Sequence, residues 1–201
     1  MTSTAADTEQ RDAGGWAARV TDALEPKNWI LAVTLLIGWH AGRVGGVAWG
    51  LCAGVFSAVI PILWITWGER RGYWGDRHVR RRQDRLIVIP GIMLSVATGL
   101  TLMRVFDAPR EVLALVVAML VCLVVFLGVT AFWKISFHTA VSSGAVTMLI
   151  LAYGPWACAL WPLVVLVGWS RVVLRDHTPA QTVVGAVAGA VIAGPVFDAL
   201  S

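Results

Sequence analysis

Charged residues are scarce in this 201-residue chain: Asp, Glu, Lys and Arg account for 14% of it, and hydrophobic residues for 58%. Soluble globular domains carry about 25% charged and roughly 45–50% apolar residues. Apolar stretches of about 14 to 23 residues take up most of the length and leave no room for a sizeable domain outside a membrane. The composition predicts an integral membrane protein and excludes an ordinary water-soluble fold.

The sequence also lacks the alternation of polar and apolar residues that is typical of barrel strands. Val112–Phe132 contains no charged residue and no such alternation. We therefore predict an all-α fold, a polytopic transmembrane helical bundle of six full spans plus a short N-terminal apolar segment. The six predicted spans are Val44–Trp67, Leu86–Met103, Val112–Trp133, Ala140–Tyr153, Trp156–Trp169 and Thr182–Phe197.

The leader and the first apolar segment differ from the rest of the chain. Residues 1–28 are a polar leader, which we expect to be disordered over Met1–Gly15. Trp29–Trp39 is apolar, but at about 1.5 Å per residue it covers only about half of a 30 Å hydrocarbon core. We expect it to be a partial or interfacial segment at the start of a single transmembrane domain, residues 29–201.

Paired cysteines and grouped carboxylates are missing as well. The three cysteines lie inside apolar stretches without CxxC spacing, which indicates core thiols and argues against a disulfide framework or a zinc site. The acids near the polar links are interspersed with cations, so magnesium has no evident ligand cage; they are Asp76, Asp84 and Asp176. We expect no metal and no other cofactor.

What the sequence does contain is a set of polar runs that share one face of the membrane. Two predicted spans separate the basic run Glu69–Arg85 from Lys134, and two more separate His138 from Ser170. Because an even number of crossings returns a chain to the same side, these runs are expected to emerge together.

The orientation of that face depends on the short first segment. With the leader counted, the face holds 13 of the 16 lysines and arginines, and the positive-inside rule alone would place it in the cytoplasm. Cations that are retained to bind a ligand weigh less as topology signals. We therefore expect that Trp29–Trp39 does not cross, that the leader is cytoplasmic, and that the polar runs open on the extracytoplasmic side of the cell membrane.

Histidines and arginines on the shared face indicate phosphate chemistry. His78, His138 and His177 lie on it, and Arg171 precedes His177 by six residues, at the end of one span and the start of the next. Guanidinium binds phosphate oxygens bidentately, and histidines beside it suit nucleophilic and general-acid work on a phosphoester or diphosphate. Alternatively, Arg70–Arg85 is a juxtamembrane patch that binds anionic headgroups.

Three motifs follow one another on this face. They are His78, six residues, Arg85-Leu86; Ile135-Ser136-Phe137-His138; and Ser170-Arg171, five residues, His177, three residues, Gln181. In this order they resemble the signatures of the type 2 phosphatidic acid phosphatase (PAP2) superfamily, the membrane relatives of vanadium haloperoxidases. The family signatures read Lys, six residues, Arg-Pro; then Pro-Ser-Gly-His; then Ser-Arg, five residues, His, three residues, Asp.

The resemblance implies a PAP2-like fold and a metal-independent lipid phosphatase that hydrolyses the phosphomonoester or diphosphate of a membrane lipid, such as an isoprenyl diphosphate or a phosphatidate-like lipid. His177 would attack phosphorus to form a phosphohistidine, and His138 would protonate the leaving group. Gln181 stands where the family has Asp and would orient His177 through its carbonyl. The implied phosphate-binding residues are Arg171, Ser136, Arg85, Lys134, His78, Arg82 and Arg81.

Two other functions stay open. A terpene-forming or phosphotransfer enzyme would use the same diphosphate pocket, whereas a non-catalytic lipid-phosphate-binding or transport protein would keep Arg171 and Arg85 without using the histidines. Asp176 either supplies the charge that Gln181 lacks, or is a local partner of Arg175 or a cap of the last helix. The expected partners are the lipid bilayer and a membrane lipid phosphate substrate, with no nucleic acid and no obligate protein partner.

Overall fold

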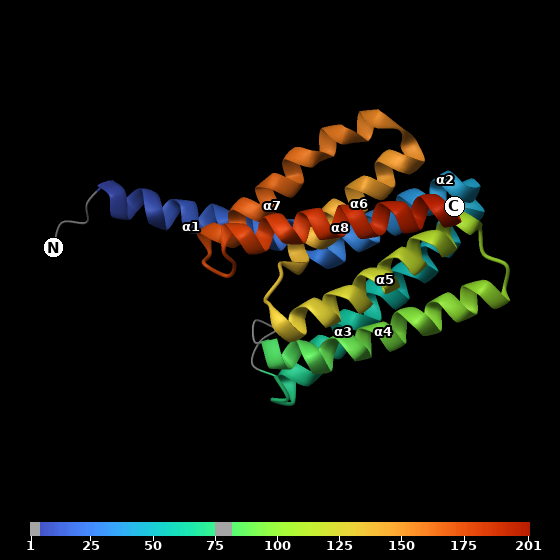
Figure 1. Ribbon diagram of the computed structural model, residues 1–201, viewed down its shortest axis with the longest axis horizontal. Helices are drawn as coiled ribbons and strands as arrows, with labels where there is room; N and C mark the ends of the chain where they lie inside the picture. Colours follow the sequence, from blue (N-terminus) through green and yellow to red (C-terminus); the bar gives the residue numbers. More distant parts are fainter. Residues whose placement is uncertain (1–4, 75–81) are drawn as a thin grey trace.

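The computed structural model describes residues 5–74 and 82–201, which form a bundle of helices (Figure 1). These residues contain no strand, so the all-α prediction is confirmed for the described part of the chain. The elements are α1 (Ala5–Ala23), α2 (Pro26–Gly54), the π-helical turn η1 (Val55–Val59), α3 (Ile60–Arg70), α4 (Arg82–Val105), α5 (Arg110–Phe132), α6 (Phe137–Tyr153), the 3-10 helix η2 (Pro155–Leu160), α7 (Trp161–Val173) and α8 (Pro179–Leu200).

The first apolar segment is half of a tight helical hairpin. Helix α2 is interrupted at Gly42 and Arg43, where Arg43 has a φ of 52°, and the chain reverses there. A Cβ atom on Gly46 would collide with the carbonyl oxygen of Gly38, so the two arms lie in backbone contact that only glycine allows. Residues 26–41 therefore run antiparallel to residues 44–70.

The hairpin places Trp29–Trp39, which we expected to be a tilted, partial or interfacial segment, against the core of the bundle. Trp29, Val33 and Ile37 are buried, in one core cluster with residues of α5 and α6. At 1.5 Å per residue the arm is about 24 Å long. It runs along the bundle because its glycine contacts and its buried face hold it against the neighbouring helices.

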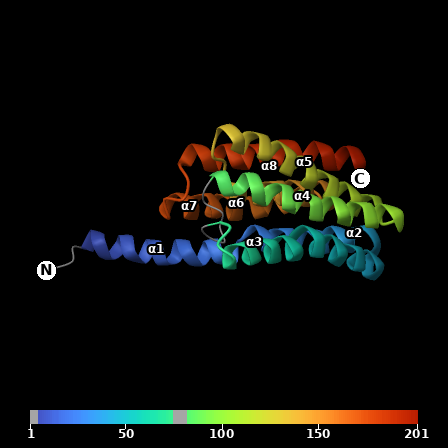
Figure 2. The same cartoon turned by 90° about the horizontal axis from the view of Figure 1, so that it is seen from below.

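The leader also differs from its prediction, because its described part is helical from Ala5 onward. Ala17 is buried, and the Thr21 hydroxyl donates a hydrogen bond of 3.0 Å to Ser170 Oγ of α7. Figure 2 shows α1 projecting from the same end of the bundle at which α7 ends. The leader and the polar run after Ser170 therefore lie at one end of the bundle, contrary to the expected opposite sides.

Five described stretches are long and apolar enough to cross a membrane: Gly14–Arg70, Leu86–Val105, Arg110–Phe132, Pro155–Val173 and Pro179–Leu200. They fit a membrane protein, as the composition predicts. The predicted count of six full spans is not confirmed. Val44–Trp67 continues from the first segment within one 57-residue helical stretch, and the helix that contains Ala140–Tyr153 has only 17 residues.

Helices α6 and α8 approach each other through glycines of α8. A Cβ atom on Gly185 would lie 2.6 Å from the carbonyl oxygen of Ser136, and one on Gly189 would overlap the carbonyl oxygen of Ala140. The backbone N–H of Ser136 also donates to the carbonyl of Gln181 over 3.3 Å. This close packing brings the start of α6, and with it His138, beside the start of α8.

Candidate active site

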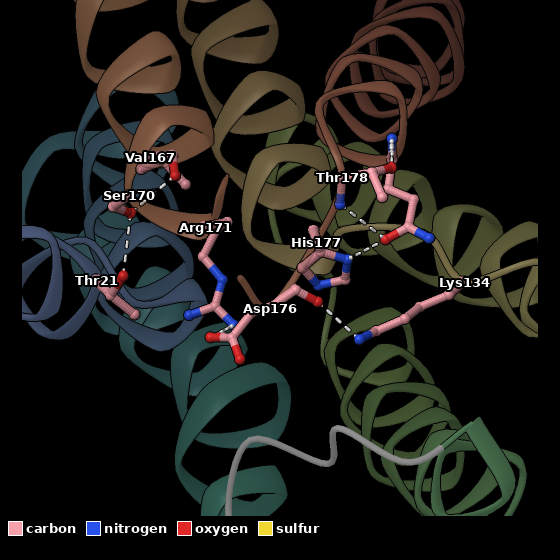
Figure 3. Close-up of polar contacts among 9 residues, drawn as sticks. Thr21, Lys134, Val167, Ser170, Arg171, Asp176, His177 and Thr178 are labelled. Atoms are coloured by element: carbon pink, nitrogen blue, oxygen red, sulfur yellow. Dashed lines mark hydrogen bonds and ion pairs between the residues drawn. The ribbon is translucent and has the colours of Figure 1, made fainter. Parts of the chain in front are cut away.

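The link between α7 and α8 places three polar side chains over one another. The N–H groups of Arg175 and Asp176 donate to the carbonyls of Val172 and Arg171 over 2.9 and 3.1 Å, which is the Schellman pattern of a helix C-terminus. Arg175 takes the left-handed position with a φ of 56°, where glycine is usual. This turn folds Asp176 and His177 back over Arg171 (Figure 3).

His177 is held by the first turn of α8. Its Nδ1 atom lies 3.1 Å from Oε1 of Gln181, and the same oxygen accepts the backbone N–H of Thr178 over 3.2 Å. Thr178 Oγ1 in turn accepts the Gln181 N–H, which completes a capping box. Gln181 therefore occupies the orienting position that the resemblance assigns to it, and Thr178, not Asp176, caps α8.

Asp176 is the partner of Arg171. Its Oδ2 atom lies 2.8 Å from Nη2 of Arg171, and both side chains are buried, with 8% and 3% of their surfaces exposed. The ammonium group of Lys134 donates a hydrogen bond of 2.7 Å to the backbone carbonyl of Asp176. Arg171, Asp176, His177 and Lys134 thus lie together in Figure 3, although the sequence separates Lys134 from Asp176 by 42 positions.

These side chains form the polar mouth of a deep cavity of about 250 Å³. His138, Arg171 and His177 line the mouth, whereas the inner walls are apolar; among the inner-wall residues are Val33, Ile92, Val96, Met148 and Ala193. A second, more open pocket shares His177 and Lys134 with the first and also touches Gln181. His177 consequently stands between an opening at the end of the bundle and an apolar chamber within it.

Ser136 is the other predicted phosphate-binding residue whose side chain the structure describes. Ser136 is buried, and its side chain packs toward Gly185 of α8 without lining either pocket. Ser136 has extended backbone just before α6 begins, which turns its side chain to the helix contact. The remaining predictions fall outside the described residues or side chains: His78, Arg81, Arg82 and Arg85.

Sequence reasoning missed a contribution from the junction of α1 and α2. Glu25 and Lys27 form an ion pair, and both line the deep cavity with His138 and His177. The signal was the helix start at Pro26, flanked by charged residues directly before an apolar segment. Thr21, one turn earlier, docks this junction on Ser170 beside Arg171 (Figure 3).

Within residues 5–74 and 82–201, no three His, Cys, Asp or Glu side chains gather as metal ligands would. The polar groups that do gather are two histidines, three cations and two carboxylates: His138, His177, Arg171, Lys27, Lys134, Glu25 and Asp176. Such a set can bind an anion, hold a nucleophile in a defined tautomer and deliver a proton.

Comparisons with known proteins agree with this geometry. Neither the curated proteins nor the solved structures include one that matches the chain. A family model, described as the PAP2 superfamily, matches residues 130–200, which contain His138, Arg171, His177 and Gln181. Residues 130–200 of this chain are thus similar to the PAP2 superfamily, and the match supports the resemblance read from the motifs.

Proposed function

We propose that the protein is a membrane lipid phosphatase that acts through a phosphohistidine at His177. Its family supports a phosphatase activity, and its apolar helices fit a membrane protein. The observation that carries the lipid substrate is the cavity, because its polar mouth at His138, Arg171 and His177 opens directly into an apolar interior. A lipid phosphate fits both kinds of lining. Its phosphate group would contact the polar side chains, and its hydrocarbon tail would contact the apolar ones.

The hydrogen bonds around His177 set up the nucleophile. Gln181 Oε1 accepts the Thr178 N–H, so the atom that faces His177 is an acceptor and Nδ1 must carry the proton. The lone pair then lies on Nε2. Its attack forms a P–N bond and breaks the P–O bond to the leaving group, whose oxygen takes a proton from His138.

Cations balance the charge that builds on the phosphoryl oxygens in this step. Arg171 reaches the substrate by exchanging Asp176 for phosphate, and Lys134 reaches it from the start of α6. Water then attacks the phosphohistidine and gives a proton to His138, the P–N bond breaks with its electron pair returning to Nε2 of His177, and inorganic phosphate leaves. The more open pocket that also touches His177 and Gln181 offers a path for that water and that product.

The direct test is phosphate release from purified protein given lipid monophosphates and diphosphates. His177→Ala removes the attacking atom, and we expect the rate to fall by more than about a thousandfold while the thermal unfolding midpoint holds. Activity within about tenfold of the wild type would refute the nucleophile. A hydrocarbon product with free diphosphate would instead indicate terpene formation, and binding without turnover would indicate a lipid-binding protein.

For the orientation, we propose that the site opens to the cytoplasm, the reverse of the orientation expected from sequence. Docking of α1 on α7 puts the leader and the site at one end of the bundle. Cations are concentrated at that end, and those with described side chains are Arg19, Lys27, Arg70, Arg71, Lys134, Arg171 and Arg175. The interruption of α2, the end of α4 and the start of α5 lie at the opposite end of the bundle (Figure 1), and they carry Arg43, Arg104 and Arg110. The positive-inside rule and the shared position of leader and site then agree.

Single cysteines test this orientation in a background without Cys52, Cys122 and Cys158. Arg19→Cys reports the site end, and Ser201→Cys reports the other end, where the C-terminus lies (Figure 1). With an impermeant thiol reagent on intact cells, we expect Ser201→Cys to be labelled and Arg19→Cys to be labelled only after lysis. The reverse pattern would place the site outside the cell.

A further inference from the structure

The chain contains two lysines, Lys27 and Lys134, and both line the deep cavity. Lys134 comes from the segment that matches the family model, whereas Lys27 comes from the first turn of α2, outside that segment. Lys27 is thus a feature of this chain that the family match does not cover. Its place in the cavity raises the question of what its charge binds.

Lys27 lines the cavity from the first turn of α2. Ile30 and Val33, further along α2, line the apolar wall of the same cavity. Lys27 keeps 36% of its side chain exposed, and its partner Glu25 keeps only 7%. The Lys27 side chain is therefore partly accessible, and its partner is a buried carboxylate that lines the same cavity.

The cavity mouth thus holds two cation–carboxylate pairs. One is Arg171 with Asp176 beside His177, and the other is Lys27 with Glu25 at the junction of α1 and α2. An anion with one phosphate group can exchange with one carboxylate, whereas a diphosphate carries charge enough to exchange with both. Two such pairs at one mouth match a ligand with two linked phosphates.

We propose that Lys27 is a specificity residue that binds the lipid-linked phosphate of a diphosphate substrate, while Arg171 binds the terminal phosphate. This assignment rests on the proposed phosphatase function and names its substrate class. His177 Nε2 attacks the terminal phosphorus, and the bond to the bridging oxygen breaks. The leaving group is then the lipid monophosphate. It keeps the former bridging oxygen, and this oxygen receives the proton from His138. Lys27 stabilises the charge left on that phosphate, and a lipid monophosphate substrate offers it no second phosphate to bind.

The test compares a diphosphate and a monophosphate that carry the same isoprenyl tail. For Lys27→Gln we expect kcat/KM for the diphosphate to fall by about 10- to 100-fold, the range for one charge-assisted hydrogen bond, and that for the monophosphate to change by less than about threefold. Lys27→Arg should keep most of the preference. Arg19→Gln is the matched control, because Arg19 is a leader cation that faces the Trp16 ring and does not line the cavity.

A binding measurement separates this inference from the phosphatase function itself. Pyrophosphate should raise the thermal unfolding midpoint of the wild type more than inorganic phosphate does, and Lys27→Gln should abolish that difference. Equal losses on both lipids, or an undiminished diphosphate preference in Lys27→Gln, would overturn the role of Lys27. If the wild type hydrolyses neither lipid, the phosphatase proposal fails. The shifts of the unfolding midpoint by pyrophosphate and by inorganic phosphate then decide alone whether Lys27 binds a second phosphate.

Discussion

Replacing Gln181 by Glu tests whether a negative charge beside His177, which the family's Asp would supply, increases the reaction rate. Glu has the shape of Gln and keeps an oxygen at the position 3.1 Å from His177 Nδ1 and 3.2 Å from the Thr178 N–H. It also suits the capping box, in which Glu and Gln serve equally at this position. Asp, the family residue, is shorter by one methylene and reaches neither partner as well. The Glu variant therefore adds a charge with little change of geometry.

The magnitude follows from the charge that His177 would gain in the proposed attack on phosphorus. A hydrogen bond to a neutral acceptor contributes about 1 kcal/mol, and one to a charged acceptor about 1.5–3 kcal/mol. Gln181→Glu should therefore stabilise the transition state by about 0.5–2 kcal/mol, which corresponds to roughly a 2- to 30-fold gain in kcat/KM. Steady-state phosphate release from the preferred lipid measures this gain, with Gln181→Met as the isosteric control that has no oxygen and should lose activity.

Thermal unfolding of the same variants separates the catalytic effect from the structural one. Gln181→Glu should hold the midpoint or raise it slightly, because a negative charge suits the N-terminus of α8. Gln181→Met should lower it, because the Thr178 N–H loses its acceptor. If Gln181→Glu slows the reaction while Gln181→Met leaves it unchanged, Gln181 does not orient the nucleophile and the reasoning above is refuted.

Three further predictions concern the acid, the turn and the packing. His138→Ala should slow an alkyl phosphate by about 10²–10⁴-fold but an activated aryl phosphate far less; equal losses would contradict the general-acid role. Arg175→Gly should keep or raise stability, and Arg175→Val should lower it by about 1–2 kcal/mol because of the positive φ, as measured by denaturation in detergent. Gly189→Ala should cost about 1–3 kcal/mol, since its methyl group overlaps Ala140, whereas Gly128→Ala, with open space around it, should be neutral or stabilising. Equal stability of the two alanine variants would show that α6 and α8 separate freely.

The sequence by itself determined the helical membrane character and the core of the site. Long uncharged stretches such as Val112–Phe132 have no stable alternative to a helix in a bilayer, because backbone groups there need partners within the segment. The spacing of Arg171, His177 and Gln181 spans one helix end, one turn and one helix start, so local geometry alone brings them together. That is why the contact between Gln181 and His177 could be expected from the sequence, and the described structure has it at 3.1 Å.

Tertiary structure decided what depends on contacts between distant segments. The reversal at Gly42 and Arg43 rests on backbone contact between two arms, which no hydropathy window detects, and it carries the leader to the site end. Asp176 pairs with Arg171 only because the Schellman turn folds it back, although Arg175 is its neighbour in sequence. Lys27 shares a cavity with His138 and His177, which lie more than a hundred residues further along the chain, because α2 packs against α5 and α6. Local spacing determines a motif, whereas the packing of whole helices determines which charges share its cavity.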